Sequence, residues 1–440
     1  MAIEFPISVD SLKAEILKTQ LQLREDLEDS EAANVLKASE QQFQVVIHKY
    51  TIANTVGDEE PVEYDWSNRL VPDKSLLRRN GYEQTVQGSG SLVMKIPLSE
   101  ASTFSRDARR IILHISIVLT DEFTQKKACF DFGSWIIAHP RRCIELEDSF
   151  FNEGEVLFEL EVVDRIGLID IPNDIRWDVT FNADWKLTEE ISRIFDRTDE
   201  NRPWREDRNG RQNDLSFQIE AGRSEAQNLD SENPLRYQAG QSTWKKIVDE
   251  IAQLDSTRGA LAFADETGQF RINRVLVIED EFPDAVWNLN LDNDSVVSGE
   301  PQLSSRDLYN ATNRWVCRGN ASIGGGSTTV FSSDIFRDED SIMETGRVVT
   351  RFVDLDSIDQ RKLDQFARFV MHCELSDRDQ FTVKTKPLPH LWHKAPVSVT
   401  SELVFGDEQP RIMAADEWEL SLNGKLQTFT FRNFPREIDL

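Results

Sequence analysis

Residues 240–273 constrain the fold more than any other part of the sequence, because both a helix and a hairpin can be read from them. The polar turn at residues 265–268 separates two short alternating runs, which predicts a strand, a tight turn and a strand. Before it, apolar residues recur at helical spacing and predict a helix with one buried face: Trp244, Ile247, Val248, Ile251 and Leu254. We expect Trp244 and Phe263 to anchor this helix and hairpin. Such a unit occurs in many α+β domains and carries no reactive group.

The first half of the chain is dominated by strand-like runs. Residues 1–45 have apolar residues at helical intervals, broken by an acidic stretch, and predict a helical N-terminal arm of one or two helices; a frayed arm is the alternative. Residues 46–186 then hold short alternating runs divided by turn residues, at 44–53, 89–98, 109–120, 132–140 and 156–171. Their length and spacing predict one all-β domain, either a barrel or a sandwich.

The second half combines helices with further strands. Residues 187–300 hold a short helix, a long polar connection and the helix and hairpin described above, so we expect a mixed α/β domain there. Residues 301–440 return to alternating strands and predict a second β-rich domain. Within it, Ser357 and Gln360 form a capping box before a helix whose buried face includes Phe366. The fold class is therefore α+β, mostly β.

Charge and composition exclude several classes of protein. With 78 acidic and 50 basic residues among 440, the formal net charge is −28, which argues against a general nucleic-acid-binding surface because phosphate contacts need clustered cations. The sequence contains no apolar run long enough to span a bilayer, and its acidic start is unlike a secretory signal. We expect a protein made in a cytoplasm, with reduced and mostly buried cysteines that lack metal-binding spacing: Cys129, Cys143, Cys317 and Cys373.

Candidate catalytic and metal-binding residues are scattered. His390 and His393 are close in sequence, but zinc needs a third ligand, so we expect two surface histidines in a proline-flanked loop. Asp292 and Asp294 match only part of a calcium loop and are interpreted as solvated turn residues. Acid pairs such as Glu147–Asp148 and Glu159–Glu161 arise by chance in so acidic a chain. We therefore expect no enzyme, and assign no catalytic, cofactor-binding or metal-binding residue and no cofactor.

Several segments together resemble one known family. Residues 244–272, WKKIVDEIAQLDSTRGALAFADETGQFRI, are similar to a helix, strand, Asp-x-x-Gly turn and strand of bacteriophage tail hub proteins, the minor tail or baseplate hub family of the tail tip. The resemblance covers residues 75–435, with Lys394 and Ala395 where the family has Gly-Asp, and the N-terminal arm has no counterpart. Further similar segments are RDLYNATNRWVCRGN, IDQRKLDQFARFVMHCEL, PLPHLWHKAPVSVT, FDFGSWIIAHPRR and EVLFELEVVDRIGLID.

The resemblance implies a structural protein of the virion tail tip. It implies a homotrimeric ring with two β-barrel-like domains per subunit and a mixed α/β insertion, which closes or adapts the distal end of the tail tube during DNA ejection. The implied partners are the tail tube or distal tail protein, the tape-measure protein and tip or receptor-binding proteins, without specific nucleic-acid binding or a membrane span. We expect a siphophage protein assembled in the host cytoplasm; a contractile tail is the alternative.

Two other functions stay open from the sequence. The chain could be a cell-wall carbohydrate-binding or carbohydrate-cleaving virion protein, in which Trp177, Trp185 and Trp204 would stack on sugars. It could also be an unrelated oligomeric β-rich scaffold.

Overall fold

The computed structural model shows a β-rich protein and describes residues 9–27, 29–51, 64–80, 87–108, 111–143, 154–169, 179–180, 217–219, 236–237, 243, 245–246, 260–268, 270–274, 282–293, 295–303, 311–323, 326–332, 336–355, 360–376 and 380–434. Its helices are α1 (Val9–Glu25), α2 (Glu31–Lys37), α3 (Leu98–Asp107), α6 (Glu339–Thr345), α7 (Gln360–Ser376) and α8 (Glu402–Phe405). None of the helices within these ranges is long and apolar enough to cross a membrane.

The strands of the first half are β1 (Gln41–Thr51), β2 (Tyr64–Asp65), β3 (Leu76–Asn80), β4 (Gln87–Pro97), β5 (Ile111–Asp121), β6 (Lys127–Arg142), β7 (Glu155–Asp164), β8 (Val179–Thr180) and β9 (Phe217–Ile219). Those of the second half are β10 (Arg236–Tyr237), β11 (Ala260–Ala264), β12 (Phe270–Arg274), β13 (Trp287–Asn290), β14 (Gln302–Leu303), β15 (Arg314–Ile323), β16 (Gly326–Phe331), β17 (Thr350–Leu355), β18 (Gln380–Thr385), β19 (Ala395–Ser401), β20 (Asp407–Ser421) and β21 (Gln427–Asn433). The mostly β, α+β class is confirmed.

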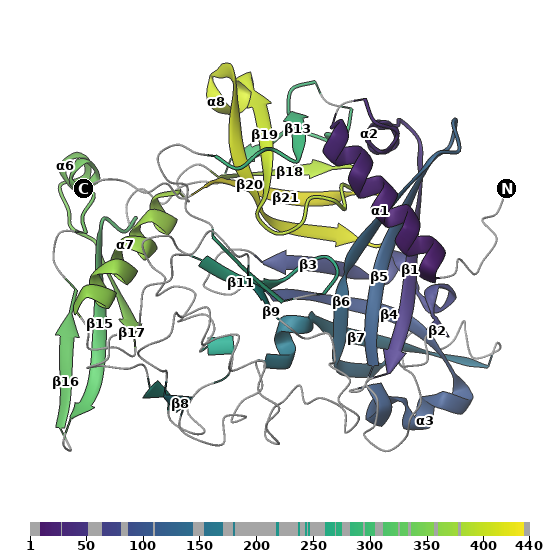
Figure 1. Ribbon diagram of the computed structural model, residues 1–440, viewed down its shortest axis with the longest axis horizontal. Helices are drawn as coiled ribbons and strands as arrows, with labels where there is room; N and C mark the ends of the chain where they lie inside the picture. Colours follow the sequence, from purple (N-terminus) through teal and green to yellow (C-terminus); the bar gives the residue numbers. More distant parts are fainter. Residues whose placement is uncertain are drawn as a thin grey trace.

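One large sheet contains strands from both β-rich segments of the chain (Figure 1). Its order is β14-β18-β21-β20-β3-β4-β7-β6-β5-β1-β2, with β13 and β19 attached beside β20. The two segments meet where residues 418–421 of β20 pair antiparallel with residues 76–79 of β3. All five strand-like runs predicted in residues 44–171 are strands of this sheet. The domain boundaries drawn from the sequence stay predictions.

Burial alternates along the central strands as the sequence pattern requires. In β7 the side chains of Val156, Phe158, Leu160 and Val162 face the core and are at most 2% exposed. Because successive side chains of a strand point to opposite faces, Glu159 and Glu161 between them lie on the more exposed side. This alternation makes β7 a half-buried strand, and the predicted acid pair is a surface feature of it.

The N-terminal arm is helical and packs on the main sheet of its own chain. Leu12 and Ile16 of α1 pack against residues of β1, β5 and β6, and each burial contributes roughly 1.5–3 kcal/mol. The side chain of Thr19 accepts a hydrogen bond from the backbone N–H of Cys129 at 3.1 Å. A second helix starts where the side chain of Ser30 caps α2. Both helices are present, and β1 begins at Gln41, inside the predicted arm.

The two ends of the main sheet approach each other through side-chain contacts. Lys386, just after β18, donates from Nζ to the carbonyl oxygen of Ala38 at 2.9 Å, and Gly424 in the β20–β21 turn lies against the ring of Phe43 in β1. These contacts bring the C-terminal strands against the start of β1. In the described residues the sheet does not close into a hydrogen-bonded barrel, and the two barrel-like domains stay a prediction.

Three smaller sheets are separate from the main one in the described residues, and the smallest pairs β8 with β10. The predicted hairpin is confirmed: β11 and β12 pair antiparallel, with Gly268 at φ +86° in the turn, and β12 also pairs with β9. The predicted helix before it falls mostly outside the described residues, where only positions 245–246 are helical. The third sheet has the order β16-β15-β17 and carries α7 on one face. The capping residue Ser357 lies outside the described residues.

Candidate functional site

The predicted anchors fall in different parts of the molecule. Phe263 lies in β11 and is 8% exposed, while Phe366 lies in α7 and is 1% exposed. Trp244 lies outside the described residues, as do the three tryptophans of the carbohydrate alternative. A group of buried polar contacts lies where the β11–β12 hairpin meets the main sheet, and we call that part of the sheet the hairpin seat.

An inward-facing arginine and aspartate form the centre of the hairpin seat. Arg79 of β3 is 3.6 Å from Asp164 of β7, measured from Nη2 to Oδ2, and their side chains are 1% and 3% exposed. Asp164 also accepts hydrogen bonds from the backbone N–H groups of Gly88 at 2.7 Å and Ile166 at 3.2 Å. Two backbone donors and one cation therefore satisfy this carboxylate inside the fold.

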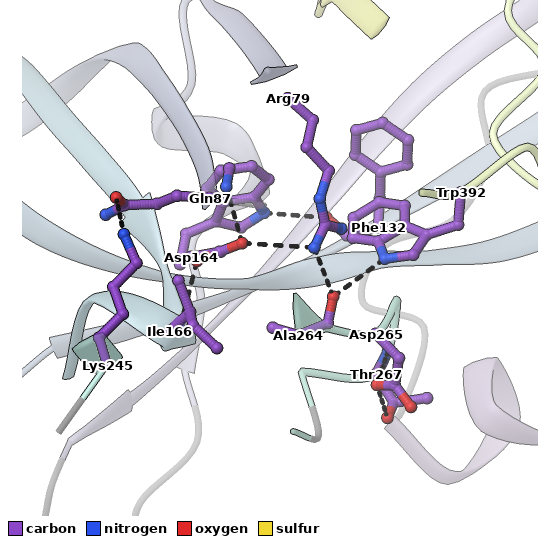
Figure 2. A network of polar contacts seen from close by, with 12 residues as sticks. Arg79, Gln87, Phe132, Asp164, Ile166, Lys245, Ala264, Asp265, Thr267 and Trp392 are labelled. Atoms are coloured by element: carbon purple, nitrogen blue, oxygen red, sulfur yellow. Dashed lines mark hydrogen bonds and ion pairs between the residues drawn. The ribbon is translucent and has the colours of Figure 1, made fainter. Parts of the chain in front are cut away.

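The same arginine holds the hairpin. Its Nη2 donates to the carbonyl oxygen of Ala264 at 2.9 Å, and the indole N–H of Trp392 donates to that oxygen at 3.1 Å (Figure 2). The guanidinium also lies over the rings of Trp392 and Phe263, at 4.9 and 5.7 Å from the ring centroids. Arg79 thus connects β3, β7, β11 and residues 390–393, which we call the HLWH turn.

Burial opposes the charge on both partners of the ion pair. It raises the pKa of Asp164 to about 6, against the attraction of Arg79, and lowers the pKa of Arg79 to about 10. A buried pair of this kind contributes little net stability, but removal of one partner leaves an uncompensated charge. The pair therefore acts as a specific attachment for the hairpin and not as a general source of stability.

The tip of the hairpin enters a bulge of β6. The backbone N–H of Gly133, which has φ +86°, donates to the carbonyl oxygen of Glu266 at 2.8 Å, and Arg165 donates to the carbonyl oxygen of Gly268 at 3.3 Å. The register between β5 and β6 shifts at this point, as expected for a bulge. A Cβ atom on Gly268 would lie 2.5 Å from Oγ of Ser134, so only glycine fits there.

A serine, a histidine and an aspartate lie beside this bulge in an order that resembles a hydrolytic triad. His114 has Nδ1 3.0 Å from Oγ of Ser134 and Nε2 2.9 Å from Oδ1 of Asp131. The serine Oγ, however, also lies 3.4 Å from the carbonyl oxygen of Thr267, and the hairpin turn covers it. The N–H groups nearby are donated within the fold, which leaves this geometry suited to holding the turn and not to stabilising an oxyanion.

The HLWH turn corrects one sequence interpretation. His390 and His393 were expected on the surface, but the ring nitrogens of both are buried. His390 packs on Trp287 at 4.9 Å, and His393 on Phe263 at 5.3 Å, between ring centroids. The prolines do keep the segment out of regular structure, but the segment folds inward against aromatic residues. Burial lowers the pKa of His390 to about 3 and the pKa of His393 well below its usual value.

Lys394, at the position where the resemblance led us to expect glycine, follows this turn. Lys394 has φ +55°, a left-handed conformation that glycine adopts without strain and that costs another residue about 1–2 kcal/mol. Its ammonium group forms an ion pair with Asp416, which is fully buried and also lies 3.0 Å from Nε of Arg432. The charged contact holds a lysine at a position where the resembled family has glycine.

Metal and thiol chemistry can be examined directly in the described residues. No group of three or more His, Cys, Asp or Glu side chains there could hold a metal ion. Asp292 accepts hydrogen bonds from Ser401 and Glu402 at the start of α8, so it is a capping residue, and Asp294 lies outside the described residues. All four cysteines are free thiols, of which Cys129 and Cys317 are buried and Cys143 and Cys373 half-buried.

The fold is similar to that of known tail proteins. No protein family and no curated protein matches the sequence. Among solved structures, a tail protein from Neisseria meningitidis MC58 aligns with a TM-score of 0.52 and 12% identity over 89% of this chain and 96% of that one. The chain has the fold of a tail protein. The family resemblance given from the sequence is therefore confirmed at the level of fold.

Two further solved structures are similar over the same extent. A 43 kDa tail protein of prophage MuSo2 from Shewanella oneidensis aligns with a TM-score of 0.47 and 14% identity, over 89% of this chain and 98% of that chain. A prophage tail protein from Listeria monocytogenes EGD-e aligns with a TM-score of 0.40 and 10% identity, over 89% and 95%. The fold likeness rests on the Neisseria structure.

Proposed function

We propose that this protein is a structural component of a phage tail tip, a hub that closes or adapts the distal end of the tail tube. The fold likeness to a tail protein carries the proposal, because it extends over 89% of this chain and 96% of that chain. The hub would connect the tube to tip and host-binding proteins. Its place would be the tail tip of the virion, after assembly in the host cytoplasm.

We infer that the hub is a homotrimer. Three copies with two β-rich segments each would present six similar surfaces, and closed rotational symmetry is the usual arrangement of soluble homo-oligomers. Its partners would be the tail tube or distal tail protein, the tape-measure protein and the receptor-binding proteins of the tip. The net charge of −28 supports a wall that repels passing DNA, since a cationic wall would bind phosphates.

The proposal includes no catalytic activity. The buried polar groups described above are engaged in holding the chain together: Arg79 and Asp164 attach the hairpin, and His114, Ser134 and Asp131 lie under its turn. An acyl-transfer site needs a nucleophile open to substrate and free donors around it. The covered position of Ser134 supports a structural role for these residues.

The test is the position and copy number of the chain in assembled tails. We would add a short epitope tag to the chain in the phage or prophage that encodes it, bind Fab fragments to the tag and image purified tails by electron microscopy. Three Fab densities in a ring at the distal end are expected. Density at the neck or capsid, or a single copy beside the tube, contradicts the hub. An untagged tail is the matched control.

A further inference from the structure

Two exposed apolar surfaces lie on different parts of the chain. The first is the outward side of the β16-β15-β17 sheet. Trp315 and Cys317 of β15 face α7 and are 1% exposed, and the indole N–H of Trp315 donates to Oε2 of Glu374 in α7 at 2.7 Å. The residues between them on β15 therefore point to the opposite side of the sheet.

That opposite side is apolar and carries one ion pair. In the strand register Val316 lies opposite Phe352, and Arg318 lies opposite both Phe331 and Asp354, so all of them share the side opposite α7. Val316 is only 6% exposed, whereas Phe331 and Phe352 are 51% and 52% exposed. We call this surface, defined by Arg318, Phe331 and Phe352, the aromatic face.

The central arginine of the aromatic face is held in place. Its Nε and Nη2 atoms each donate to a different carboxylate oxygen of Asp354 at 2.8 Å, and its guanidinium lies 5.2 Å from the centroid of the Phe352 ring. A bidentate contact and a ring together restrict the side chain, so little entropy is lost when a partner binds it. An ordered arginine between two exposed aromatic rings has the composition of a protein-binding hot spot.

The second surface is the tip of the β19–β20 hairpin. There α8 ends at Gly406 with φ +74°, and Leu403 is 75% exposed, one of the most exposed large apolar side chains in the described residues. Exposed acids surround it, namely Glu402, Asp407 and Glu408. Figure 1 shows α8 at the end of a hairpin that projects from the molecule, while β16 and β15 form another edge of it. We call residues 402–408 the acidic knob.

We propose that the acidic knob of one copy of this chain docks on the aromatic face of the next copy. Leu403 would lie between Phe331 and Phe352, and the acids around it would face Arg318. Because the two surfaces differ, the contact is heterologous, and repeated contacts of this kind close into a ring when the rotation between copies allows it. The proposal rests on the trimeric hub proposed above and names the surfaces that join its subunits.

The distribution of charge favours a second copy as the occupant. The chain is strongly acidic, with a net charge of −28, so most of its surface would be repelled by another copy. The Arg318–Asp354 pair leaves the aromatic face without net charge, so an acidic apolar tip of the same chain meets no net repulsion there and buries ring surface. The acidic knob is such a tip within the described residues.

The experiment measures self-association of the full chain by sedimentation velocity and mass photometry over a range of concentrations. Leu403→Ser and Glu408→Arg change the knob, and Arg318→Glu changes the face. Each is expected to raise the dissociation constant of the oligomer by about tenfold or more. The double variant Glu408→Arg with Arg318→Glu is expected to recover most of the loss. Phe123→Ser, at a side chain that is 72% exposed in the β5–β6 turn, is the matched control and should associate like the wild type.

A mixing experiment tests whether the contact is heterologous. Leu403→Ser keeps an intact face and Arg318→Glu keeps an intact knob, so an equimolar mixture is expected to form dimers that neither variant forms alone. Circular dichroism confirms that each variant is folded, and because residues 403 and 408 lie exposed at a hairpin tip, those two changes leave the core untouched.

The outcomes separate this contact from the proposed function. A wild-type trimer that all three single variants leave intact overturns the knob-to-face contact while the trimeric hub stands. A wild type that stays monomeric at every concentration, in solution and in the tail, removes the trimer and the contact together. Loss of association in the single variants without recovery in the double variant also overturns the pairing of Glu408 with Arg318.

Discussion

Replacement of Arg79 by methionine tests how the hairpin is attached to the main sheet. The change keeps most of the side-chain volume, removes the cation beside Asp164 and deletes one of two donors to the Ala264 carbonyl. That carbonyl keeps its hydrogen bond from Trp392, so its loss is modest, about 1–2 kcal/mol. The uncompensated carboxylate is the larger effect, because both side chains are at most 3% exposed and solvent screens them little.

The cost of this change depends on pH with a definite sign. The folded-state pKa of Asp164 is raised from its usual value to about 6, so the folded protein takes up a proton as the pH falls below about 6 and gains stability relative to the unfolded chain. Without Arg79, this pKa rises further. We expect Arg79→Met to destabilise the hairpin attachment by about 3–5 kcal/mol at pH 8, and by only about 1–2 kcal/mol at pH 5, where the carboxyl is neutral.

Hydrogen exchange of residues 260–268, compared between variant and wild type at each pH, measures the local opening directly, and urea unfolding measures the global effect. Asp164→Asn provides the matched background. In that background Arg79→Met should cost the same at both pH values, since the titrating group is absent. An equal loss at pH 5 and pH 8 in the otherwise native chain would falsify the assignment of the buried pair.

Three further expectations follow from single positions. Gly424→Ala should lower the free energy of unfolding by about 1–3 kcal/mol, because the new Cβ would lie 2.2 Å from a ring atom of Phe43. Gly346→Ala is the control and should cost about 1 kcal/mol or less, because the space around Gly346 is open. Thermal unfolding compares the two variants, and equal losses of stability contradict the close packing at Gly424. His390→Phe should reduce the loss of stability that the wild type shows between pH 6.5 and pH 4. Burial lowers the pKa of His390 to about 3, so the wild-type histidine takes up a proton on unfolding in that pH range. If the urea midpoint of the variant depends on pH as strongly as that of the wild type, the ring is not buried. Iodoacetamide at pH 8 should modify Cys143 before Cys317, because Cys317 is buried and its burial raises the pKa of the thiol to about 12. Peptide mass spectrometry measures the order of modification, and the reverse order contradicts the burial of Cys317.

The strands could be predicted because their signal is local. Alternation of apolar and polar residues is visible within a few positions, and β4, β5, β6 and β7 lie where it occurs. The order of the strands could not be predicted in the same way. The pairing of β20 with β3 joins residues more than three hundred positions apart, and only the packing of the whole chain determines it.

The residues at the centre of the hairpin seat can be recognised from the sequence pattern of their strands. Leu77 and Arg79 share the inward side of β3, and the inward row of β7 that begins with Val156 ends on Asp164. A cation and an acid, each at an inward position of a strand, are more informative than acid pairs adjacent in sequence, because burial forces them to find partners. The alternation of inward and outward positions along each strand could have identified Arg79 and Asp164 as buried charged residues. It could not have predicted that the two side chains contact each other.

The prediction that His390 and His393 lie on the surface was wrong. Prolines around His390 and His393 correctly indicated irregular structure, and irregular segments usually run over the surface. Here the segment carries Leu388, Leu391 and Trp392, all buried, and these apolar residues draw the turn inward. The apolar content of the turn was the available signal, and it outweighed the rule for loops.

The contact between Lys386 and the carbonyl of Ala38 spans 348 positions in the chain. A ribosome that adds about 5–20 residues per second needs roughly 17–70 s to travel that distance. Throughout that interval the newly made first strands have an edge of the growing sheet without its final neighbours, and exposed strand edges readily pair with other chains. Strand β3 therefore lacks its final neighbour β20 until the end of the chain has been synthesised.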